Sequence, residues 1–273
     1  MGMENALVKK GLTGHTIKII GIILMFICHI NQMFFMYGVP AWLDWFGRPV
    51  AIIFLFFCAE GFAYTRSRTK YLLRLLIGFE LMYVVSMQLS KAVPSQTMLM
   101  NSIFGTLFLA ALLMFAADMI LNGVKAKRGG KIACGILLLL SPVIATAVVN
   151  ELIAQVLNGA IPFWAIPFIG AIPSFVTVEG SFIFPLLGLL FYLLRKDGFK
   201  ARLIQLIHLA VFCIYSAVIG STEWMAIFAA IPLLLYNGER GKGSKYFFYI
   251  FYPAHIYGLY LISWAIGQII NNA

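Results

Sequence analysis

Two histidines are the residues of this chain best suited to chemistry inside an apolar environment. His29 and His255 each lie within a long apolar run, near opposite ends of the sequence. Imidazole exchanges protons near neutral pH, so either side chain can act as a general base toward a hydroxyl or an amine. Ionisable groups in hydrocarbon cost about 2.5–3.5 kcal/mol on insertion scales, which makes each a functional candidate. The alternative interpretation is a histidine that only hydrogen-bonds a neighbouring helix.

The spacing of these histidines from basic residues predicts that they reach the same depth. His29 follows Lys18 by 11 residues, and His255 follows Lys245 by ten. At ~1.5 Å per helical residue these distances are about 16 Å and about 15 Å. Both imidazoles are therefore expected near the middle of a bilayer, if both lysines mark the same membrane face.

A carboxylate and a basic run form a second candidate set. Glu60 precedes a dense group of cations: Arg66, Arg68, Lys70 and Arg74. A buried carboxylate needs a partner, and Arg48 lies about 18 Å away along the same predicted helix, so we expect Glu60 to pair with another span. Arginine binds phosphate through bidentate contacts, although basic residues also simply mark topology and contact headgroups. Glu80 and Asp118 are interpreted as polar groups in helix packing.

Composition predicts the elements that must position these residues. Hydrophobic residues make up 62% of the 273 residues, charged residues 11%, and the mean hydropathy is +0.94. Soluble domains carry roughly a quarter of their residues as charged types. The apolar runs are long enough to cross ~30 Å of hydrocarbon and lack the alternation of a membrane barrel. We predict an all-α, polytopic integral membrane bundle of about nine to ten transmembrane helices, forming one domain over residues 1–273.

The positions of the basic residues predict the topology. The net charge is +10, and 18 of the 20 Lys and Arg lie in five clusters. Except at the N-terminus, each cluster follows every second apolar run, which is the positive-inside pattern. The charge thus indicates topology and contact with anionic lipid, and no nucleic-acid partner. The protein is expected in the cell membrane with a cytoplasmic N-terminus. The predicted spans are 16–36, 46–64, 71–90, 101–122, 131–149, 179–194, 202–219, 224–237 and 246–269.

Residues 161–177 are the uncertain part of this topology. They contain three prolines and no basic residue. Counting them as a span would move the following basic cluster to the outer face, so we interpret them as an outer-face or re-entrant segment.

Several functional classes lack their motifs in this sequence. It contains no Walker loop, no G-x-S-x-G and no HExxH, which disfavours an ATP-driven pump and a membrane zinc protease. The four cysteines show no CxxC or Cys/His zinc spacing. No metal is predicted.

An ordered set of motifs resembles the TraX family of membrane proteins. Residues 12–30 resemble that family's first span, which usually ends in Met-x-x-Asp-His. The Gly-Arg at 47–48, the Glu-Gly-Phe-x-x-Thr-Arg at 60–66 and residues 70–75 resemble its second segment. Residues 236–241 (Tyr-Asn-Gly-Glu-Arg-Gly) and 248–255 resemble its last two blocks. Two departures are Cys28, which replaces the Asp before the histidine, and Pro49, which directly follows Arg48.

The resemblance implies acyl transfer from acetyl-CoA. TraX proteins are similar in turn to a broader superfamily of membrane acyltransferases, in which ten residues separate a basic residue from a catalytic histidine. Lys18 and His29 have that spacing. By this analogy His29 is the general base, His255 and Glu60 complete the catalytic site, and the cofactor is held by a basic set: Lys18, Arg48, Arg66, Arg68, Lys70 and Arg74.

The leading hypothesis is therefore a membrane acetyltransferase. It would move an acetyl group from cytoplasmic acetyl-CoA to a hydroxyl or amine on a peptide, glycan or small molecule. A proton-coupled transporter or flippase that uses the same histidines is the first alternative, and a scaffold for a larger membrane assembly is the second. Binding of CoA separates the first hypothesis from the other two.

Overall fold

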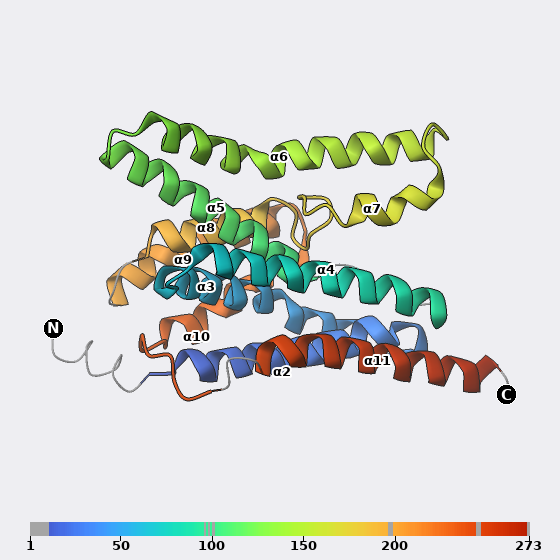
Figure 1. Cartoon of the computed structure of the whole chain (residues 1–273). Coiled ribbons are helices and arrows are strands. Elements are labelled where there is room, and N and C mark those ends of the chain that lie inside the picture. The colour runs from blue at the N-terminus through green and yellow to red at the C-terminus, as the bar shows by residue number, and fades with distance from the viewer. Residues whose placement is uncertain are drawn as a thin grey trace. The chain divides into compact units, whose positions relative to one another are not determined.

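Helices occupy all nine predicted spans. The structure, a computed structural model, describes residues 11–271 except 96, 98, 100, 101, 196–198 and 244–246. In this part of the chain the β-structure consists of one isolated bridge, between Leu12 and Tyr236. The predicted all-α membrane fold is confirmed (Figure 1). Four lysines of the predicted basic clusters lie outside the described residues: Lys9, Lys10, Lys196 and Lys245.

Five helical segments are long and apolar enough to cross a membrane. Two of these segments join an α-helix to a 3-10 helix: α2 is followed directly by η1, and η2 is followed directly by α3. Each segment has 23 to 29 residues, which exceeds the about 20 needed to cross the hydrocarbon. The elements are α2 (Gly14–Phe34), η1 (Phe35–Tyr37), η2 (Ala41–Gly47), α3 (Arg48–Tyr64), α4 (Arg68–Ala92), α5 (Ile103–Lys125) and α6 (Gly129–Leu157).

The remaining four predicted spans differ in length. Two of them are occupied by helices of fewer than 18 residues, and a third by a 20-residue helix whose apolar stretch, Arg202–Val218, is shorter than a full span. They correspond to α8 (Ile183–Leu193), α9 (Phe199–Val218) and the pair η4 (Thr222–Ala229) and α10 (Ala230–Leu234). The last is α11 (Phe247–Asn271), which has 25 residues and contains Pro253 within the helix.

The helices fall into two compact units. Unit 1 contains the residues up to Phe57, residues 88–99 and the residues from Leu194 onward. Unit 2 contains residues 58–87 and the chain from residue 100 to Leu193. Unit 1 therefore combines the first and last helices of the described residues, α2 and α11, and both predicted histidines lie in it.

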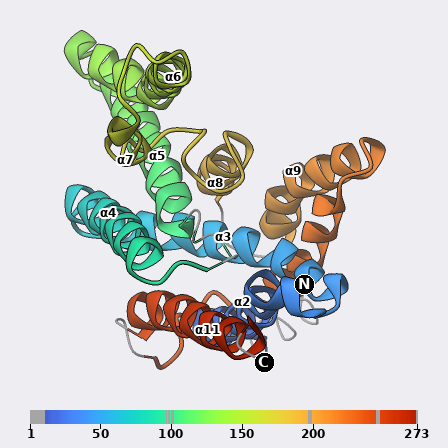
Figure 2. The ribbon, with the colours of Figure 1, turned by 90° about the vertical axis from the view of Figure 1, so that its right-hand side faces the viewer.

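Glycines allow close helix packing in unit 2. A Cβ at Gly135 on α6 would lie 2.6 Å from a side-chain carbon of Ile120 and 3.0 Å from the carbonyl oxygen of Ala116, both on α5. Small residues let membrane helices approach this closely, where dispersion contacts replace the hydrophobic effect. Figure 2 shows α5 and α6 side by side as the resulting hairpin.

Residues 161–177 contain no helix that could cross the membrane. The segment forms η3 (Phe163–Ala165) and the five-residue α7 (Ile166–Gly170). Ile169 packs with Val149 and Val156 of α6 in a small apolar cluster. Farther on, Phe175 N–H donates to the Thr146 hydroxyl at 3.0 Å. The segment folds back on α6, in agreement with its interpretation as a non-spanning segment.

In unit 1, α2 and α11 lie side by side and run in the same direction (Figures 1 and 2). Near the C-terminal end of α2 the Ser263 hydroxyl donates to the Met33 carbonyl at 2.6 Å. The Tyr37 hydroxyl donates to the Ser263 carbonyl at 2.9 Å. Because the two helices are parallel, both enter the membrane from the same face.

The orientation predicted from the basic clusters can be tested with fusions at both ends. We expect green fluorescent protein to fluoresce when fused before Met1, because that end is predicted to be cytoplasmic. Alkaline phosphatase, which matures only after export, should be active when fused after Ala273. Phosphatase activity at the N-terminal fusion, or its absence at the C-terminal one, would contradict the predicted topology.

Candidate functional site

Helix α2 carries Lys18 and His29 on one face. Thr13 begins the helix, and its hydroxyl accepts from Thr16 N–H at 3.3 Å. Eleven residues are close to three full turns, so Lys18 and His29 project from the same side about 16 Å apart along the axis. Met25 lies between them on the same face and is buried, as are Ile17 and Cys28 on the adjoining face. His29 is only partly buried.

The two histidines are in direct contact. His29 Nδ1 lies 2.7 Å from His255 Nε2, and the ring centroids are 5.0 Å apart. His255 is buried on α11, and its Nδ1 lies 2.8 Å from the Phe251 carbonyl oxygen. The two residues are 226 positions apart in the sequence, and they lie at one level, as the spacing from the lysines predicted.

This chain of contacts fixes the tautomers of the neutral pair. A carbonyl oxygen only accepts, so His255 Nδ1 must carry the proton that it donates to Phe251. The Nε2 atom of neutral His255 is then an acceptor, and His29 Nδ1 must donate to it. His29 is left with an unprotonated Nε2 that faces neither partner. The arrangement leaves His29 Nε2 as a basic nitrogen, and the hydrogen bond from Nδ1 to His255 holds the His29 ring in place.

Aromatic rings surround the pair. The Phe251 ring stacks on His255 at a centroid distance of 4.7 Å, and Tyr252 meets the edges of both imidazoles. Phe26 contacts His255 from α2. Such walls exclude water and favour a neutral imidazole, which is the form that accepts a proton. Among the described residues, no group of three His, Cys, Asp or Glu side chains could hold a metal ion.

Lys18 lies near the N-terminal ends of α2 and α11, in the line of contact between these two helices, which is called the α2–α11 seam below. Its ammonium is 5.0 Å from the centroid of the Phe57 ring and 5.6 Å from that of Phe248. Cation–π contacts of this kind hold a lysine ammonium close to apolar surface. The seam thus carries a positive charge at one level and the histidine pair about three turns farther along α2.

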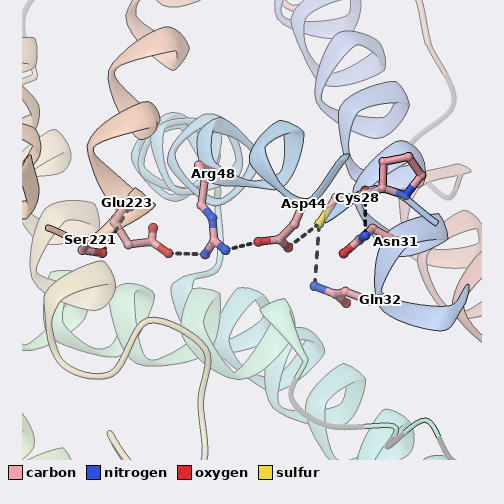
Figure 3. A network of polar contacts seen from close by, with 8 residues as sticks. Cys28, Asn31, Gln32, Asp44, Arg48, Ser221 and Glu223 are labelled. Carbon is pink, nitrogen blue, oxygen red and sulfur yellow. Dashed lines mark hydrogen bonds and ion pairs between the residues drawn. The ribbon is translucent and has the colours of Figure 1, made fainter. Parts of the chain in front are cut away.

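Arg48 lies in an ion-pair network, although it was predicted to bind cofactor. Its guanidinium contacts the carboxylates of Asp44 and Glu223 (Figure 3). Two carboxylates more than balance one cation, so the network carries a formal charge of −1. That balance opposes phosphate binding at Arg48 and favours a role in joining η2, α3 and η4. Asp44 has a sequence signal, because it precedes Arg48 by four residues, whereas Glu223 has none.

Cys28 adjoins the same network. Its thiol lies 3.6 Å from an Asp44 carboxylate oxygen and 3.6 Å from Gln32 Nε2 (Figure 3). A Cβ at Gly47 would come within 2.4 Å of the Cys28 sulfur, so the Gly-Arg pair at 47–48 needs its glycine for packing. Consecutive helical residues point about 100° apart. Cys28 therefore faces Asp44 while His29 faces α11, and His255 takes the position of an orienting group.

The other predicted site residues belong to unit 2, where one of them, Arg68, joins a polar cluster. Arg68 pairs with the Asp118 carboxylate, and the Tyr192 hydroxyl donates to the same carboxylate at 2.8 Å and 2.9 Å. The Arg68 guanidinium also lies 5.2 Å from the centroid of the Phe62 ring. Asp118, interpreted from sequence as a packing residue, is the acceptor that holds α4, α5 and α8 together. Arg68 thus has a structural contact, and its predicted role in cofactor binding stays a prediction.

The rest of the basic run is more open. Arg66 and Lys70 are exposed, while Arg74 lies over the Tyr71 ring at 5.8 Å and donates to the Lys70 carbonyl at 3.2 Å. Glu60 is partly buried on α3. The catalytic role predicted for Glu60 and the cofactor binding predicted for these cations stay predictions.

Comparison with known proteins identifies one family. The family model described as TraX protein matches residues 13–263, which is most of the chain. No curated protein and no solved structure matches.

Removing the Arg48 cation should destabilise the protein. Arg48→Met leaves Asp44 and Glu223 close together without compensation, and their side chains are about 28% exposed. We expect a loss of about 1–2 kcal/mol, seen as a lower Tm in detergent. Adding Glu223→Gln should restore part of the loss, because one of the repelling charges is gone. If the stability losses of Arg48→Met and Glu223→Gln simply add in the double variant, the network is contradicted.

The Asp118 carboxylate is expected to contribute to the stability of unit 2. Asp118→Asn removes the charge that Arg68 meets, and the Asp118 side chain is only 13% exposed. We expect a decrease of about 1–2 kcal/mol in the free energy of unfolding, measured by thermal or denaturant unfolding. The control Tyr192→Phe removes one hydrogen-bond donor and should cost less. An unchanged Tm for Asp118→Asn would show that the ion pair is not needed.

Proposed function

The chain belongs to the TraX family, and from that premise we propose that it is a membrane acetyltransferase. It takes acetyl-CoA from the cytoplasm and delivers the acetyl group to a hydroxyl or amine acceptor. His29 is the general base and His255 is the residue that positions it. The observation that carries this proposal is the 2.7 Å contact between His29 Nδ1 and His255 Nε2, backed by the Phe251 carbonyl.

The directed hydrogen bonds explain how His29 would work. Its Nε2 removes the proton from the acceptor O–H or N–H as the acceptor attacks the thioester carbonyl carbon. The imidazolium that forms keeps its Nδ1–H on His255, so the second ring stabilises the new charge. The C–S bond then breaks, and the Nε2 proton passes to the leaving sulfur. The products are the acetylated acceptor and CoA with a free thiol.

Lys18 supports the direction in which the donor would enter. It shares a face of α2 with His29 and lies toward the N-terminal end, which is predicted to be cytoplasmic. CoA has anionic phosphates at one end and the thioester at the end of its long pantetheine arm. Phosphates near Lys18 would place that arm along the α2–α11 seam, with the thioester toward His29. Association of charged ligands with such a basic entrance is also favoured electrostatically.

Replacing His29 tests the proposed reaction. We expect His29→Ala to lower acetyl transfer, or acetyl-CoA hydrolysis when no acceptor is known, by about 10²–10⁴-fold because the general base is lost. His208→Gln is the matched control, a membrane histidine on α9 outside the proposed site. Unchanged turnover in His29→Ala would reject the catalytic role. Proton-linked solute flux without CoA binding would instead support the transporter.

Two substitutions at His255 separate positioning from simple packing. His255→Leu removes the acceptor behind His29, whereas His255→Gln offers an amide oxygen that can still accept from Nδ1–H. We expect kcat to fall about 10–100-fold in His255→Leu, by analogy with partners that orient ligating histidines, with KM for acetyl-CoA little changed. His255→Gln should recover part of kcat. Equal losses in both variants would point to packing alone.

A further inference from the structure

The loop between α10 and α11 is held against the start of α2. Leu12 N–H donates to the Leu235 carbonyl at 2.7 Å, and Asn237 N–H donates to the Leu12 carbonyl at 2.9 Å. Farther along the loop, the carbonyls of Glu239 and Arg240 accept from the first turn of α2, at 2.8 Å and 2.9 Å. These bonds fix the backbone of residues 235–240. They also occupy N–H groups at the start of α2, so an anion here would have to be bound by side chains.

Glycines give the loop its shape. Gly238 and Gly241 have φ values of +84° and +75°, which favour glycine. A Cβ at Gly241 would lie 2.4 Å from the Thr13 hydroxyl oxygen, and one at Gly243 would lie 2.1 Å from His15 Nδ1. The φ values favour glycine at 238 and 241, and at 241 the close approach to Thr13 does so as well; at 243 a side chain would have to displace the His15 ring. This explains in physical terms the Asn-Gly-Glu-Arg-Gly block noted in the sequence.

Basic residues gather on and beneath this loop. Arg240 and Lys242 are exposed on it. Beneath it, Arg202 is buried, donates to the Tyr236 carbonyl and places its guanidinium 4.9 Å from the centroid of the Tyr236 ring. Tyr236 packs edge-to-face on Phe57 at 5.3 Å.

The opposite side of this stack carries another cation. Lys18 lies over the Phe57 ring, as described above. The described part of the loop and the residues packed beneath it thus carry four Lys or Arg side chains (Lys18, Arg202, Arg240, Lys242) and one carboxylate, Glu239. The local balance is strongly positive.

Membrane topology alone does not require such a construction. The positive-inside pattern needs basic residues near a span but no particular backbone. Here the cations lie on a backbone fixed by hydrogen bonds and shaped by glycines. The fixed loop also adjoins the α2–α11 seam, because His15 and Lys18 both contact the Phe248 ring. A site at this position would receive the anionic end of a ligand whose other end reaches His29, about 16 Å away along α2.

We propose that the loop 235–243 binds the phosphates at the nucleotide end of CoA, with Arg240, Lys242 and Lys18 as the cationic groups. This inference rests on the proposed acetyltransferase function and names the place where its donor is held. Arg202 holds the Tyr236 carbonyl and ring beneath the loop. Phosphate esters are also found in lipid headgroups, so the shared chemistry is phosphate recognition by fixed cations.

The test compares pairs of exposed cations in nanodiscs made of zwitterionic lipid. We expect Arg240→Gln/Lys242→Gln to raise the Kd for CoA roughly tenfold, as two partly exposed charge contacts would. Turnover of acetyl-pantetheine, which lacks the nucleotide, should stay unchanged. Lys125→Gln/Lys131→Gln removes the same charge from exposed positions near the α5–α6 turn and should leave the Kd for CoA unchanged.

The outcomes separate this inference from the proposed function. If the wild-type protein binds no CoA, the acetyltransferase proposal itself fails. If the wild type binds CoA and the loop variant binds it equally well, the loop site alone is overturned. If Arg66→Gln/Lys70→Gln weakens CoA binding and the loop variant binds CoA as well as the wild type does, the phosphates belong to unit 2. A loop variant that loses only binding to anionic-lipid vesicles would make the ligand a headgroup and would also overturn the CoA site.

Discussion

Hydrocarbon offers no hydrogen-bond partner, so a polar side chain carried into an apolar helix has to be met by another group of the protein. Three clusters in this chain follow from that constraint. His29 meets His255, Arg48 meets two carboxylates, and Asp118 meets an arginine and a tyrosine. Two of them hold helices together. The histidine pair differs, because its hydrogen bonds leave one basic nitrogen without a partner in the chain of contacts.

The histidine pair lies between two points at which α2 and α11 are fixed. At the start of α2, the loop that leads toward α11 is hydrogen-bonded to the first turn. Near the other end, Ser263 donates to the Met33 carbonyl, and Tyr37 donates to that of Ser263. Sliding α11 along α2 would break the hydrogen bonds that Ser263 makes with Met33 and Tyr37. In the reaction proposed here, a general base held this way would need little reorganisation, which is the benefit of building a site on regular helices.

The cysteine at position 28 has a simple geometric interpretation. A residue directly before His29 on a helix points about 100° away from it, so its side chain is poorly placed to orient the imidazole. Cys28 instead contacts Asp44, which is itself paired with Arg48. In this protein the carboxylate beside Arg48 comes from position 44. The Cys28 side chain thus joins the ion-pair network, while the His29 ring contacts His255.

Sequence alone determined the helices and the depth of their polar residues. Hydropathy is a property of consecutive residues, so all nine predicted ranges contain helices, and the rise per residue was enough to place His29 and His255 at one level. It did not determine partners. Glu223 had no signal for Arg48, Asp118 was interpreted as a packing residue, and the tautomer of His29 depends on a carbonyl of another helix. Tertiary structure decided these points, because a helix can offer the same polar residue to any neighbour, and only packing selects which faces meet.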